Sequence, residues 1–108
     1  EGVMAWICLL AAGCLEMVWV TAMKLSDGFT RVGYSVLTVA AMAASVWLLD
    51  QAVKTLPMGT AYAVWTGIGA LGAVVLGIVI FKEPATAARM FFAALLLVGI
   101  IGLKATAH

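Results

Sequence analysis

Charged residues are scarce in this chain. Of its 108 residues only 10% are Asp, Glu, Lys or Arg, whereas 66% are hydrophobic. Soluble globular domains average about 45–50% apolar and about 25% charged residues. A soluble fold has too little interior to bury this much apolar surface, so we expect the excess to face lipid. The net charge of +1 gives no indication of a nucleic-acid partner.

Cysteine and histidine are also rare. Cys8 and Cys14 lie six positions apart in one expected helix and point in nearly opposite directions, so we expect free thiols. His108 is the only histidine and the last residue, which favours a frayed tail over a ligand. The sequence therefore predicts neither a metal site nor a cofactor, and it does not indicate an enzyme.

Charged and helix-breaking residues divide the chain into four long apolar stretches. We expect transmembrane helices at about residues 4–23, 32–49, 56–81 and 85–103. The last one is long enough only if Arg89 snorkels to the membrane interface. Residues 4–108 are thus predicted to form a single all-α transmembrane domain. Residues 1–3 precede the first methionine, and we expect them to be a remnant of cloning.

The distribution of Lys and Arg predicts only a weak preference for one orientation in the membrane. With four spans, the loop containing Lys54 and the C-terminal segment containing Lys104 share one side. The other four cations, Lys24, Arg31, Lys82 and Arg89, share the opposite side. A bias of two against four slightly favours a cytoplasmic location for the second group and leaves insertion in both orientations possible.

Glu16 is the most informative residue because it is the only charged residue between Met4 and Met23. An acidic group at the centre of a transmembrane helix costs about 2.5–3.5 kcal/mol on insertion scales measured for Asp. Such a group usually faces a protein interior or an aqueous cavity and carries function. The alternative is a structural carboxyl group, protonated and hydrogen-bonded to a neighbouring helix.

Helical spacing identifies the residues that can surround Glu16. Gly13 and Trp19 lie within one turn of it, so we expect Gly13 to open space and Trp19 to supply an aromatic wall with an indole donor. Tyr62 and Trp65 form a stripe with Gly69 on the third expected helix, and Ser45 supplies a polar edge on the second. These aromatic residues can attract a cation through their rings, although interface anchoring and packing are common roles for aromatics in membrane helices.

The segment from Gly67 to Gly72 matches the G-x-G-x-x-G pattern of dinucleotide-binding loops. No strand is expected before it, and it lies inside an expected transmembrane helix. We therefore reject a nucleotide site. Glycines at these positions are better explained by close helix contact or by a bend.

The sequence resembles that of the small multidrug resistance transporter family. The resemblance is carried by the segment from Lys54 to Ala70 (KTLPMGTAYAVWTGIGA), by Glu16 and by Phe81-Lys82-Glu83-Pro84. It covers nearly the whole chain from Met4 onward. Within the family, Gly13, Trp19 and the late Lys104 make the chain most similar to the guanidinium exporter subtype.

The resemblance implies an antiparallel homodimer in the bacterial inner membrane that exports guanidinium and small substituted guanidinium ions. It also implies a proton-coupled antiporter, in which protons and substrate compete for Glu16 of both protomers. Gly13, Trp19, Ser45, Tyr62 and Trp65 would then line the shared site. Inserting two copies in opposite orientations makes an inverted repeat, and Gly99 and Gly102 offer small-residue surfaces for dimer contact.

Two alternatives remain at this point. The nearest is a quaternary ammonium or multidrug exporter of the same family, which differs in its substrate. The other is a nonenzymatic membrane assembly subunit, as in proton-driven rotor rings whose small helical subunits carry one carboxylate at membrane depth. Comparing the transport of different cations distinguishes a multidrug exporter from a guanidinium exporter. The mass of the solubilised protein distinguishes an assembly subunit from a dimeric transporter.

Overall fold

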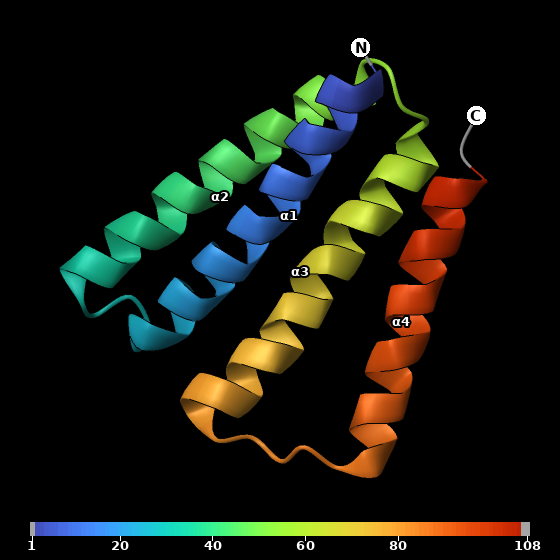
Figure 1. Cartoon of the computed structure of the whole chain (residues 1–108). Coiled ribbons are helices and arrows are strands. Elements are labelled where there is room, and N and C mark those ends of the chain that lie inside the picture. Colours follow the sequence, from blue (N-terminus) through green and yellow to red (C-terminus); the bar gives the residue numbers. More distant parts are fainter. Residues whose placement is uncertain (1, 107–108) are drawn as a thin grey trace.

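The structure is a computed structural model that describes residues 2–106, and all regular elements in this range are helices. They are α1 (Gly2–Leu25), α2 (Val32–Val53), α3 (Met58–Phe81) and α4 (Ala87–Ala105) (Figure 1). All four are long and apolar enough to cross a membrane. The expected all-α architecture with four potential spans is confirmed. The expectations for Glu1 and His108 concern positions outside the described residues.

Local interactions place several helix ends away from the expected positions. The helix α1 begins at Gly2, and α2 continues past Leu49 to Val53. Pro57 occupies the position before α3 and so excludes Leu56 from that helix. The helix α4 begins at Ala87, two residues later than expected, because Thr86 caps it: the Thr86 hydroxyl oxygen accepts a hydrogen bond of 3.2 Å from the backbone N–H of Arg89.

A tight turn joins α1 to α2 and makes them antiparallel neighbours. Asp27, Gly28 and Phe29 all have positive φ values, of 51°, 70° and 64°. This left-handed conformation is unfavourable for the two residues that carry a Cβ. Ser26 supports it, since its hydroxyl oxygen accepts a 3.1 Å hydrogen bond from the N–H of Phe29 and donates one of 2.6 Å to the carbonyl of Met23.

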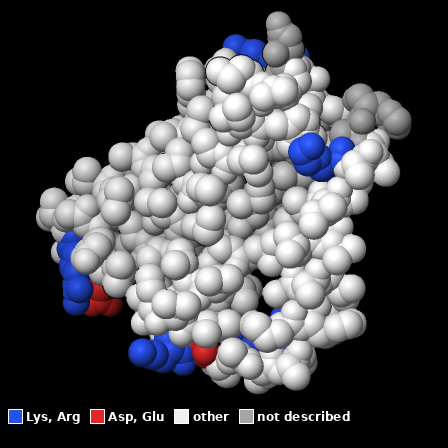
Figure 2. Space-filling view, viewed as in Figure 1, with Lys and Arg blue, Asp and Glu red and all other residues white. Residues whose placement is uncertain are grey.

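The loops, and the charged residues other than Glu16, gather at the two ends of the molecule. The N-terminus, the α2–α3 loop and the C-terminus lie at one end, and the other two loops lie at the opposite end (Figure 1). In the space-filling view, the Lys, Arg, Asp and Glu side chains that can be seen lie towards these ends, with an uncharged surface between them (Figure 2). This distribution suits a protein whose middle is surrounded by hydrocarbon.

Packing between helices is centred on α1. The helix α1 lies against both α2 and α3, whereas α4 lies against α3. Leu9, Ala52, Ala61 and Val64 form a small buried core. The glycines of α3 allow close approach: a Cβ on Gly67 would lie 2.8 Å from Cδ1 of Ile100 in α4. The interpretation of these glycines as helix-contact positions is confirmed for the described chain.

Candidate cation site around Glu16

Glu16 lies in the middle of α1 on the side that faces α3. The residue is only 9% exposed. Its side chain rests against the backbone of Gly69, where an added Cβ would lie 2.8 Å from Cβ of Glu16 and 3.8 Å from Oε1. A larger residue at position 69 would therefore clash with the side-chain carbons of Glu16 that carry the carboxylate. The sequence places Gly69 on the Tyr62–Trp65 stripe, and the structure brings it directly to Glu16.

Trp19 orients the carboxylate. Its indole Nε1–H donates a 2.9 Å hydrogen bond to Oε2 of Glu16. The two residues are three positions apart and thus share a face of α1. Oε1 accepts no hydrogen bond from residues 2–106 and is not completely buried. One carboxylate oxygen is thus held in place and the other is accessible.

Ser45 links three helices rather than contacting Glu16 within one chain. The Ser45 side chain is fully buried. Its hydroxyl donates a 2.7 Å hydrogen bond to the carbonyl of Ala12 in α1 and accepts one of 2.9 Å from Nε1–H of Trp65 in α3. Ala12 lies one turn before Glu16, just as Trp65 lies one turn before Gly69. Ser45 therefore fixes the indole of Trp65 one turn away from the carboxylate.

Tyr62 and Trp65 form an aromatic pair on α3. Their ring centroids are 5.7 Å apart with an interplanar angle of 51°. Trp65 is half-buried, whereas Tyr62 is 57% exposed. The phenol oxygen of Tyr62 has no hydrogen-bond partner among the described residues. The hydroxyl group of Tyr62 is thus free to form a hydrogen bond with a ligand or with a second protein chain.

Gly13 has a different environment from the expected one. The sequence predicts open space at Gly13, but the side chain of Ile68 fills that space. A Cβ on Gly13 would lie 2.7 Å from Cγ2 of Ile68. Gly13 therefore brings α1 and α3 together next to Glu16, and the resulting proximity positions the carboxylate against Gly69. The sequence alone gave no signal that Ile68 would point towards α1.

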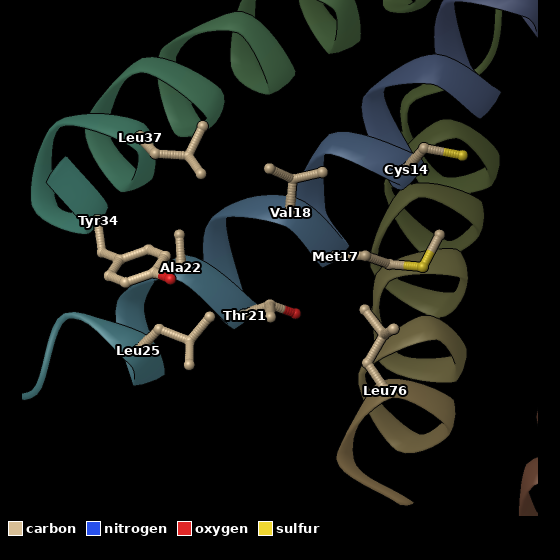
Figure 3. A pocket seen from close by; sticks show the side chains of 9 residues that line it. All are labelled: Cys14, Met17, Val18, Thr21, Ala22, Leu25, Tyr34, Leu37 and Leu76. Carbon is tan, nitrogen blue, oxygen red and sulfur yellow. The ribbon is translucent and has the colours of Figure 1, made fainter. Parts of the chain in front are cut away.

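A pocket elsewhere on α1 lacks acidic residues. It has a volume of about 440 Å³ and is lined by Cys14, Met17, Val18, Thr21, Ala22, Leu25, Tyr34, Leu37 and Leu76 (Figure 3). At about 100° per residue, Cys14 and Val18 point about 160° away from Glu16 around α1. Because its lining is apolar, this pocket offers nothing to hold a small hydrophilic cation. The carboxylate of Glu16 lies on the opposite side of α1.

The chain is similar to known proteins over nearly its whole length. Residues 4–96 match the model of a family described as Small Multidrug Resistance protein. A guanidinium exporter of Yersinia pestis is 57% identical over 101 residues, which cover 94% of this chain and 97% of that protein. Guanidinium exporters of Citrobacter freundii and Salmonella typhimurium are 52% identical over 105 residues, which cover 97% of this chain and 100% of theirs.

Proposed function

Because the chain belongs to the small multidrug resistance family, we propose that it is a multi-pass transporter of the bacterial inner membrane that exports guanidinium and small substituted guanidinium ions in exchange for protons. The observation that carries this proposal is the carboxylate of Glu16. It is the only charged side chain in the middle of α1, with Oε2 held by Trp19 and Oε1 open. The names of the relatives support guanidinium as the substrate.

The chemistry of a guanidinium ion matches this arrangement. The ion is planar and presents N–H groups in pairs, which suit hydrogen bonding to both oxygens of a carboxylate. Trp19 restricts rotation of the Glu16 carboxylate, so less conformational entropy is lost when the cation binds. The rings of Trp19 and Trp65 can lie against the flat faces of the ion and add cation–π attraction.

We further propose that the working unit is an antiparallel homodimer. One chain supplies one Glu16, one half-exposed Tyr62 and an α4 without buried residues. A second copy in the opposite orientation would bring a second carboxylate and a second aromatic pair to a shared site. Two such copies form an inverted repeat, the arrangement on which many alternating-access transporters are built. The weak asymmetry of Lys and Arg between the two ends permits both orientations.

Proton coupling then needs only competition for the two carboxylates. Protons and guanidinium bind the same oxygens, so a site that holds the cation excludes the protons. If the empty, deprotonated dimer changes its orientation slowly, each outward passage of substrate must be matched by inward passage of protons. The exchange follows from this mutual exclusion without any further moving part.

Transport in liposomes tests the substrate and the coupling together. The purified protein is reconstituted, a proton gradient is imposed, and movement of guanidinium, methylguanidinium and tetraalkylammonium ions is compared. We expect transport of the first two ions with proton movement in the opposite direction. Preferential transport of tetraalkylammonium would favour the multidrug alternative, and absence of transport with a solubilised mass well above a dimer would favour an assembly subunit.

Accessibility labelling tests the antiparallel arrangement separately. Cys8 and Cys14 are replaced, and single cysteines are introduced into the loops. In cells, we expect each loop to be labelled by a membrane-impermeant reagent from both sides of the membrane. Labelling of each loop from one side only would contradict the antiparallel dimer, whatever the substrate.

A further inference from the structure

A second pocket joins the apolar one at the end of α1 that carries Lys24. Its volume is about 260 Å³, and it is lined by Val20, Thr21, Lys24, Ala73, Val74, Leu76, Gly77, Phe81, Glu83 and Arg89. Thr21 and Leu76 line both pockets and lie at the edge of the apolar one in the close view (Figure 3). The two pockets therefore adjoin each other at Thr21 and Leu76. We call them together the groove, with an apolar part between α1 and α2 and a charged part that contains Lys24, Glu83 and Arg89.

The charged part of the groove carries an excess of cationic groups. Arg89 forms a long ion pair with Glu83, with 3.5 Å between Nη2 and Oε1, and both side chains remain more than one third exposed. Lys24 has no carboxylate within salt-bridge distance among the described residues. Its Nζ lies 5.0 Å from the ring centroid of Phe81, a contact that leaves N–H donors free. Two cations thus face one carboxylate.

We propose that this groove binds an anionic phospholipid, with the phosphate at Lys24 and Arg89 and one acyl chain along the surface from Cys14 to Leu25. The pattern of an apolar trough that ends in cations at the limit of the hydrophobic span matches a lipid with a negative headgroup. A free anion would use only the charged part, and a zwitterionic lipid would bring its own cation towards Lys24. The inference does not depend on the proposed transport function.

The lipid site and the cation site are separate. The apolar part of the groove lies on the face of α1 roughly opposite Glu16, and Glu16 lines neither pocket. A bound lipid would therefore not compete with a cation for the carboxylate. It would fill the space between α1, α2 and the end of α3, where Val18 and Leu37 face the same cavity (Figure 3).

Native mass spectrometry of the full chain, released from nanodiscs, tests this proposal. The nanodiscs contain equal amounts of phosphatidylglycerol and phosphatidylcholine with identical acyl chains. We expect preferential retention of phosphatidylglycerol, reduced about fivefold by Lys24→Gln and similarly by Arg89→Gln, since each cation near a membrane surface contributes a factor of this order. Lys54→Gln is the matched control, because Lys54 is exposed at the opposite end of the molecule, and it should leave retention unchanged.

A groove-filling variant tests the acyl-chain half of the site. Val18→Phe places a larger side chain in the apolar part without changing any charge, and we expect it to reduce retention of phosphatidylglycerol. Equal retention of the two lipids by the unaltered protein would overturn the proposal. So would displacement of phosphatidylglycerol by inorganic phosphate alone, or a loss on Lys54→Gln as large as that on Lys24→Gln.

Discussion

The first three helices differ from α4 in the burial of their residues. The helices α1, α2 and α3 each bury residues, and Ser45 joins all three through its bonds to Ala12 and Trp65. The helix α4 has no buried residue, and Phe92 and Val98 are each 64% exposed. A Cβ on either Gly99 or Gly102 would meet nothing within 4 Å. One chain therefore buries residues of α1, α2 and α3, whereas α4 lies against α3 without burying a residue of its own.

This difference suggests that α1–α3 form the binding site and that α4 serves assembly. Buried polar contacts in α1–α3 position the carboxylate, so substitutions there should change binding and transport. Exposed apolar residues on α4 are compatible with lipid, and small residues let a second helix approach closely, so substitutions there should change assembly. Each of the following experiments is directed at one side of this division.

The largest effect is expected from Glu16→Gln. The variant keeps the size of the side chain and an oxygen that can accept from Trp19, but it removes the negative charge. We expect complete loss of both guanidinium binding and proton-coupled transport in liposomes, with assembly preserved. Asp50→Asn removes a carboxylate near the end of α2 and should leave transport intact. Full proton-driven exchange by Glu16→Gln would contradict the proposed mechanism.

The next largest effect is expected from enlarging the open face of α4. Gly99→Leu combined with Gly102→Leu adds bulk where one chain has free space, so the packing of α1–α3 should survive. We expect the dimer to dissociate, as measured by the mass of the detergent-solubilised protein, and transport to fall with it. A variant that stays dimeric with normal transport would show that these glycines lie outside the dimer contact.

A moderate effect is expected from Trp19→Gly. Loss of the hydrogen bond to a charged carboxylate should weaken guanidinium transport by roughly tenfold. The missing ring should also enlarge the site and admit bulkier cations. Initial rates for guanidinium and tetraalkylammonium ions measure both changes. Trp47→Gly, at an exposed position on α2, is the control for loss of an indole. If Trp19→Gly changes neither rate, Trp19 is a packing residue.

The smallest effect is expected from Ser45→Ala. It leaves the carbonyl of Ala12 and the indole of Trp65 without their common partner, a loss of about 1–3 kcal/mol for a buried polar group. We expect reduced thermal stability and transport a few times slower, with an unchanged preference for guanidinium. Ser35→Ala is the control, because the Ser35 hydroxyl bonds to the carbonyl of Arg31, the residue just before α2, and so links no second helix. A change of substrate preference in Ser45→Ala would place Ser45 in direct contact with the cation.

The sequence by itself determined the four-helix architecture and the isolation of Glu16. Both depend on local properties: the length of apolar stretches, the positions of charges and the spacing of residues on one helix. The same spacing places Trp19 one turn from Glu16, and the structure has the two side chains hydrogen-bonded. These features need no knowledge of how the helices pack.

Only the tertiary structure decided which faces meet. It placed Ile68 in the space at Gly13, the backbone of Gly69 against Glu16, and Ser45 between Ala12 and Trp65. Each of these contacts joins different helices, and their rotation and separation depend on the simultaneous fit of many side chains. A one-dimensional pattern shows which residues share a face of one helix, but the neighbour of that face is fixed by packing between helices.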